Sequence, residues 1–139
     1  MDAQVATRPP ILEEMLHHVT LEVAPGDIER SLELWGLLGF EQVEPPPALA
    51  ETFFWVEREG TQIHLERNES PTVPPHGHAA VVVADFEQAV ERLREHDFEV
   101  KPGRKHWGAP RAKVLAPGGH QVEFMATPPG SFQKARNEG

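Results

Sequence analysis

Short runs in which apolar and polar residues alternate recur along the chain, a pattern typical of half-buried β-strands. The first run extends from about Met15 to Val23, and the others cover residues 40–43, 52–57, 62–66, 78–84, 98–100, 111–115 and 120–125. Two further stretches carry apolar residues at helical spacing, one over 28–38 and one after Asp85. The pattern predicts an α+β fold of eight strands and two helices.

Turn and capping residues mark the boundaries of these elements. Asp27 and Asp85 stand where the two helices are expected to begin, and Gln88 follows Asp85 at the spacing of a capping box. Gly60 separates two of the strands and predicts a hairpin. The proline-rich segment 71–77 predicts a linker between two halves of the chain.

The two halves repeat one order of elements, β-α-β-β-β. His18 corresponds to His78 at an offset of 60 residues, and residues 60–65 correspond to 119–124 at an offset of 59. A repeat of this kind indicates two similar modules that can share a core.

We therefore predict one domain at 13–127, made of modules 13–67 and 76–127. The two βαβββ modules are expected to form a curved mixed sheet around a cleft. Residues 1–12 are predicted to be a flexible N-terminal arm, and residues 128–139 a flexible C-terminal tail.

Composition excludes several classes of protein. The chain of 139 residues has no cysteine, so it forms neither disulfides nor thiolate metal sites. The net charge of −9 disfavours nucleic acid as a partner. No segment has the apolar length of a signal-peptide core or of a membrane span, so we expect a cytoplasmic protein without a membrane partner.

The charge is unevenly distributed between the halves. Residues 1–75 contain 14 acidic and 4 basic residues, whereas residues 76–139 contain 8 acidic and 9 basic residues. A cluster of basic residues in the second half could bind an anionic substrate, although each of them taken alone is expected to be a solvated surface side chain. Its members are Lys101, Arg104, Lys105, Arg111 and Lys113.

Four ionisable side chains occupy matching places in the two halves. Successive side chains of a strand point to opposite faces, so His64 and Glu123 each stand opposite apolar neighbours. His18 and His78 lie in the first strand of their respective halves. Imidazole and carboxylate groups are ligands of divalent transition metals. The arrangement predicts a metal site on the open face of the sheet.

The neighbours of these four residues are assigned by the same alternation. Thr20 and Glu22 share the face of His18, whereas His17 points toward the apolar side and is assigned to the core or the strand edge. Three adjacent aromatic residues at 53–55 must divide between the two faces, so one or two of them are expected to line the cleft or a subunit interface. His96, His106 and His120 are expected at the surface.

Five motifs in this order resemble those of the vicinal oxygen chelate superfamily, which includes glyoxalase I, extradiol dioxygenases and bleomycin resistance proteins. They lie at residues 18–23, 34–40, 60–65, 77–78 and 117–123. The resemblance implies metal ligands on the first and last strand of each module, here His18, His64, His78 and Glu123. A glutamate commonly stands at the position of His64 in glyoxalase I, so the implied ligand set is three imidazoles and one carboxylate.

The resemblance implies a metal-dependent lyase or isomerase. Its divalent ion (Zn, Ni, Fe, Mn or Co) would chelate neighbouring oxygens of a small substrate and stabilise an enolate or oxyanion as it forms. Glu123, or Glu22 in its place, is the expected catalytic base. The expected substrate contacts are Thr20, Gln62, Gln121, Trp107 and Arg111, the last two in a loop that could cover the cleft.

Two other functions fit the same resemblance. One is a non-haem Fe(II) dioxygenase, which the absence of tyrosine from the chain disfavours, because the extradiol pattern usually includes one. The other is a non-catalytic protein of the bleomycin resistance type, whose acidic cleft would sequester a cationic drug. The resemblance also implies a homodimer, and the sequence leaves open whether one chain or two supply the four ligands.

Overall fold

The computed structural model describes residues 16–130. Its first module contains four strands and one helix in the order β-α-β-β-β. They are β1 (His18–Val23), α1 (Ile28–Leu37), β2 (Glu41–Val43), β3 (Phe53–Arg58) and β4 (Thr61–Arg67). The second module repeats this order after the linker. Its elements are β5 (His78–Val82), α2 (Phe86–Glu95), β6 (Val100–Pro102), β7 (Arg111–Leu115) and β8 (Gln121–Met125).

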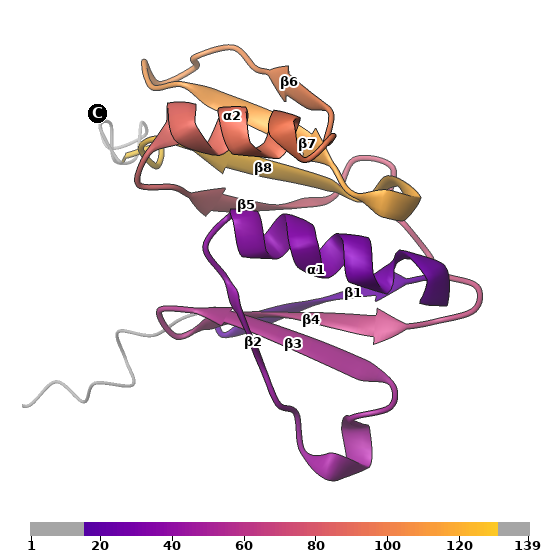
Figure 1. Ribbon diagram of the computed structural model, residues 1–139. Helices are drawn as coiled ribbons and strands as arrows, with labels where there is room; N and C mark the ends of the chain where they lie inside the picture. Colours follow the sequence, from indigo (N-terminus) through magenta and orange to yellow (C-terminus); the bar gives the residue numbers. More distant parts are fainter. Residues whose placement is uncertain (1–15, 131–139) are drawn as a thin grey trace, which may run out of the picture.

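Each module forms a four-stranded mixed sheet of the same topology, so the predicted fold class is confirmed (Figure 1). The strand orders are β1-β4-β3-β2 and β5-β8-β7-β6. The first and last strands of each module run parallel, and the other neighbours are antiparallel. The edge strands of the two sheets are β1 and β2 in the first and β5 and β6 in the second. Of these, β2 and β6 are only three residues long. Prolines 45–47 follow β2, and Pro102 ends β6.

Most predicted boundaries agree with the structure to within one or two residues. β1 begins at His18, because His17 lies outside the strand and Met15 lies outside the described residues. The strand predicted at 98–100 instead covers Val100–Pro102, because residue 98 packs into the core at the end of α2. The predicted arm at 1–12 also lies outside the described residues, as does the predicted tail after residue 130.

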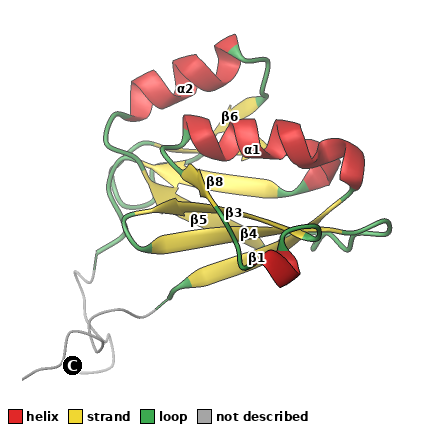
Figure 2. Ribbon diagram, turned by 60° about the horizontal axis from the view of Figure 1, so that its bottom comes forward, coloured by secondary structure: helices red, strands yellow, loops and turns green. Residues whose placement is uncertain are grey.

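The two helices lie side by side and cover the same side of the two sheets (Figure 2). Beneath them, one continuous cluster of buried side chains forms the core, and its largest fully buried members are Leu34, Trp35, Leu65, Leu93 and Phe124. Among residues 16–130, neither α1 nor α2 lies on the opposite faces of the sheets (Figure 2). No helix within residues 16–130 has the length and apolar composition that a membrane crossing requires.

Two hydrogen bonds join the modules. Arg58, in the hairpin of the first module, donates to the Val82 carbonyl of β5 and to the Leu38 carbonyl at the end of α1. His120, beside the hairpin of the second module, contacts the Glu22 carbonyl of β1 through Nε2 at 2.8 Å. Val82 and Glu22 occupy equivalent places in the repeat. Each module therefore offers a carbonyl of its first strand to a side chain near the hairpin of the other module.

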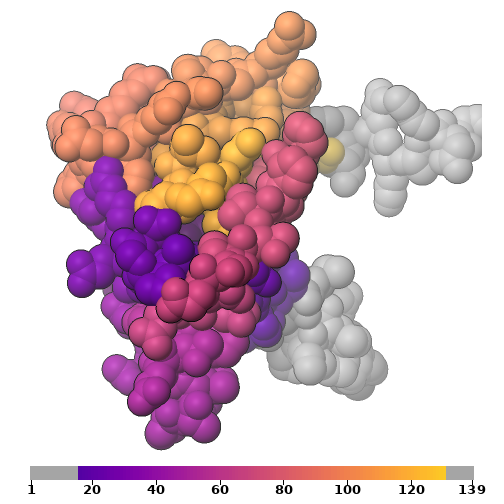
Figure 3. Space-filling model, turned by 90° about the vertical axis from the view of Figure 1, so that its right-hand side faces the viewer, coloured from indigo at the N-terminus to yellow at the C-terminus, as the bar shows by residue number. Residues whose placement is uncertain are grey.

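The linker lies across the side of the molecule where the modules meet (Figure 3). The backbone N–H of Thr72 donates to the Glu22 carboxylate at 2.8 Å, and Val73 approaches Gly119 in the turn before β8. Both contacts hold the end of β1 beside the start of β8.

Candidate functional site

In the first module, three flat rings stack on the open face of the sheet. The His64 ring lies between Trp55 and His18, with ring centroids separated by 4.2 Å and 4.0 Å. This order follows from topology, because β4 lies between β3 and β1 and the register pairs Trp55 with His64. Only 6% of His64 is exposed. Of the three aromatic residues at 53–55, Trp55 is the one that stacks on His64.

Hydrogen bonds fix the protonation of His64. Its Nε2 lies 2.7 Å from Oε1 of Gln62, whose amide nitrogen donates to Glu57 at 2.7 Å. Because the carboxylate orients the amide, Oε1 faces the imidazole and Nε2 carries the hydrogen, which leaves the lone pair on Nδ1. Burial, followed by the charges of His18 and His17, lowers the pKa of His64 to about 4. At neutral pH the His64 ring is therefore uncharged, and the lone pair on its Nδ1 is free to bind a ligand.

Of the two places predicted for His17, the core and the strand edge, the core is wrong, and its ring does not point to the apolar side. It is exposed, its Nδ1 lies 2.9 Å from Nδ1 of His18, and its ring centroid lies 6.5 Å from that of His64. The prediction failed because His17 precedes β1, where the two-residue alternation does not apply. Three imidazoles therefore gather on this face.

In the second module, Glu123 is buried between two cationic or ionisable partners. Its Oε1 lies 3.0 Å from Nε2 of His78, and its Oε2 accepts a hydrogen bond of 2.8 Å from Nε of Arg111. Burial raises the pKa of Glu123, but the hydrogen bond and charge of Arg111, and then those of His78, lower the pKa more. The net pKa lies below its ordinary value, so this carboxylate is ionised at neutral pH.

The residue types of the two pairs suit a divalent transition metal. His78 also has the orientation found in metal-binding histidines, because its Nδ1 lies 2.9 Å from the His76 carbonyl, an acceptor, and its Nε2 faces Glu123. Within residues 16–130 of one chain, however, no three His, Asp or Glu side chains lie close enough together to hold a metal ion.

The separation of the pairs follows from the contact between the modules. His120 holds the Glu22 end of β1 beside the start of β8, where His78 pairs with Gln121. His18 lies at the other end of β1, roughly 13 Å away along an extended strand. In one chain the two pairs, His18 with His64 and His78 with Glu123, therefore lie apart, and each is a candidate half-site.

The other predicted site residues are divided between these half-sites. Thr20 is exposed and pairs in register with His64, and Gln62 holds the His64 ring. Gln121 lines a cavity beside Glu123. Glu22 lies apart from His18, because its carboxylate is bound to the linker and its carbonyl to His120.

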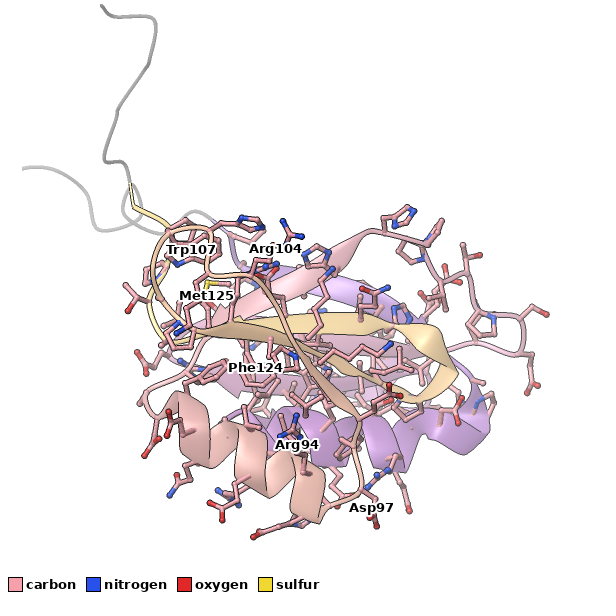
Figure 4. The ribbon with its side chains drawn as sticks, turned by 90° about the horizontal axis from the view of Figure 1, so that it is seen from above. Arg94, Asp97, Arg104, Trp107, Phe124 and Met125 are labelled. Atoms are coloured by element: carbon pink, nitrogen blue, oxygen red, sulfur yellow. The ribbon has the colours of Figure 1, made fainter. Side chains whose placement is uncertain are left out.

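Trp107 lies over the end of the open face, as the view from above shows (Figure 4). Its indole N–H donates to the Thr127 carbonyl at 2.7 Å, and the Arg111 guanidinium lies 5.6 Å from its ring centroid. Met125 is almost fully buried on this side, whereas Phe124 points toward the helices (Figure 4). The loop that contains Trp107 therefore lies at this end of the sheet.

Two structural roles were not predicted. His120 was expected at the surface, but it is buried because it crosses between the modules to reach the Glu22 carbonyl. Lys113 was noted only as part of a basic group. The register places Lys113 directly beside Glu123. Arg111 and Lys113 are two residues apart and share one face of the strand, so alternation could have indicated that both lie on the side of Glu123.

Sequence comparison places most of the chain in one family profile. The profile of the Glyoxalase/Bleomycin resistance protein/Dioxygenase superfamily matches residues 15–124. No curated protein matches the chain significantly.

Structural comparison identifies several similar folds at low sequence identity. A Bacillus anthracis protein classed in the glyoxalase family has a TM-score of 0.72 and 22% identity, over 81% of this chain and 93% of its own. The oxidase ChaP-H2 has a TM-score of 0.65 and 21% identity, over 84% and 96%. TnmS3, an antibiotic binding protein from Streptomyces sp. CB03234, has a TM-score of 0.62 and 19% identity, over 81% and 94%. At these identities the similarity concerns the fold alone.

Proposed function

Because the chain belongs to the Glyoxalase/Bleomycin resistance protein/Dioxygenase superfamily, we propose that it is a metal-dependent lyase or isomerase whose site is completed by a second copy. Each site would take His18 and His64 from one copy and His78 and Glu123 from the other. The ion would be Zn, Ni, Fe, Mn or Co, and the substrate a small molecule with neighbouring oxygens.

The matched positions of the two half-sites carry this proposal. His18 and His64 occupy the same register positions in β1 and β4 that His78 and Glu123 occupy in β5 and β8. Charge also favours pairing of unlike modules, because the first half of the chain is strongly acidic and the second is slightly basic.

The side chains of this protein would divide the chemistry as follows. A bound divalent ion supplies a Lewis acid that stabilises an enolate or oxyanion. His64 offers a neutral nitrogen, and Gln62 keeps its ring in one orientation. Glu123 is ionised because Arg111 holds its second oxygen, so Oε1 is available to bind the ion or to take a proton from a carbon beside a carbonyl.

A complementation experiment tests the shared site. In homodimers purified without chelator, His18→Ala and Glu123→Ala should each lose the metal, measured by elemental analysis, while circular dichroism shows a retained fold. A heterodimer of the two single variants contains one site with all four ligands, so it should recover about half of the wild-type metal content.

The matched control is a heterodimer of wild type with the double variant His18→Ala, Glu123→Ala. It contains the same substitutions but no complete shared site, so it should bind no metal. Metal in this control but not in the first heterodimer would place all ligands within one chain. Full occupancy in both single variants would remove the ligand assignment.

A drug-binding protein is the second candidate, favoured by the aromatic face of the first module. The Trp55 indole N–H is buried and has no hydrogen-bond partner among the described residues, and it belongs to a stack of flat rings. Such a surface suits an aromatic cation. A protein that is metal-free after purification without chelator, yet binds bleomycin, would favour this function.

Substrate-dependent oxygen uptake after Fe(II) loading would instead favour a dioxygenase.

A further inference from the structure

A cavity of about 300 Å³ opens on the second sheet beside Glu123. It lies along β6 and β7, and three of its lining residues are basic: Lys101, Arg111 and Lys113. One acidic residue, Glu99, also lines it. This excess of positive charge stands out in a chain whose net charge is −9.

The charges of the cavity are only partly compensated by the protein. Arg111 is held by Glu123, and its Nη1 donates to the Arg104 carbonyl at 3.1 Å. Lys101 lies 3.6 Å from Glu99 and is largely exposed. Lys113 has no carboxylate within salt-bridge distance among residues 16–130.

Lys113 is the informative residue, because it is partly buried as well as unpaired. Taking a cation out of water without a counterion costs free energy, and an anionic ligand would offset that cost. Lys113 stands next to Glu123 across β7 and β8, so an anion bound to it would lie beside the proposed metal ligand.

We propose that this cavity binds the carboxylate or phosphate group of a small substrate. Lys113 supplies the principal charge, and the partly exposed side of the Arg111 guanidinium supplies a second donor. The proposal rests on the proposed function in one respect: the rest of the same molecule would reach the His78–Glu123 pair. The volume suits a small molecule, because the cavity is bounded by Pro102, Gly103 and the edge of the sheet.

Direct titration of metal-free protein tests the cavity separately from catalysis. Inorganic phosphate and succinate are added at low ionic strength, with succinamide as an uncharged control of similar shape, and binding is followed by calorimetry and backbone amide shifts. At least one anion should bind and shift the amides of β6 and β7, while succinamide should not. Equal binding of succinamide, or no binding of either anion, would overturn the proposal.

Variants separate a specific site from general attraction by charge. Lys113→Gln should weaken anion binding about tenfold or more, since a charge-assisted hydrogen bond is lost. Lys113→Arg should restore most of it. Arg67→Gln removes one positive charge from an exposed position at the end of β4 and should change nothing. Equal losses in Arg67→Gln and Lys113→Gln would refute the site.

The variant His78→Ala tests the anion-binding cavity separately from the proposed metal site. It should lose the metal but keep anion binding, because His78 does not line the cavity. Anion binding without any metal binding in the wild type would refute the proposed function and leave the anion site intact.

Discussion

The chemistry of the open faces depends on a few contacts between individual side chains. Alternation within strands correctly predicted that His64 and Glu123 turn away from the core side of their strands. It did not predict that Arg111 holds Glu123, because that contact depends on which residues of β7 and β8 lie opposite each other. His17 was misassigned because it lies just outside the strand.

The buried imidazole of His64 should make the metal-free protein sensitive to acid. Its pKa is about 4 when folded and about 6.5 when unfolded, so below pH 6.5 the unfolded chain binds a proton that the folded chain does not. The free energy of unfolding should therefore fall as the pH decreases from 6.5 to 4, by on the order of 3 kcal/mol.

Denaturant unfolding at a series of pH values, with chelator present, measures this loss. His64→Phe keeps an aromatic ring in the stack but removes the titrating group, so its stability should depend less on pH. His106→Gln, at an exposed position in a loop, should behave as the wild type does. Parallel pH profiles for the wild type and His64→Phe would show that His64 is not responsible.

At the scale of elements, the sequence predicted the order β-α-β-β-β twice, because hydrophobic spacing and turn residues are local properties. It predicted the two helix caps less well. Asp85 accepts a hydrogen bond of 3.0 Å from the backbone N–H of Gln88, as expected for a cap. Asp27 makes no such bond, because a short 3-10 turn at Pro25–Asp27 leads directly into α1.

This difference gives a matched pair of substitutions. Asp85→Ala should lower the free energy of unfolding by about 1 kcal/mol, since it removes a cap that satisfies a helix N–H. Asp27→Ala removes the same carboxylate from the same helix position and should cost less, within about 0.5 kcal/mol. Chemical denaturation measures both, and equal losses would contradict the assignment of the cap to Asp85.

For the whole molecule, the sequence predicted two modules but not how they meet. The contact between His120 and the Glu22 carbonyl joins residues 98 positions apart, and no local pattern indicates it. The separation of His18 and His64 from His78 and Glu123 has the same origin. Repeat spacing places ligands on equivalent strands but does not determine which edges of two sheets lie together.

Arg58 provides a test of the joint between the modules. Arg58→Met keeps much of the side-chain volume but leaves the carbonyls of Leu38 and Val82 without their donor. The expected loss of unfolding free energy is about 2–4 kcal/mol, since two bonds from a charged group are removed. Arg67→Met, at an exposed position, serves as the control and should have little effect. A negligible change in Arg58→Met would show that the joint depends on other contacts.

The brevity of β2 and β6 has a consequence for the behaviour of the protein at high concentration. A long, flat outer strand can recruit a strand from another molecule and begin a fibril. Here one edge strand of each sheet, β2 or β6, offers only three residues, and proline, which has no N–H to donate, stands within or shortly after it. Fibril growth is thereby discouraged at the β2 and β6 edges, so contact between two copies through the open faces need not lead to polymerisation along those edges.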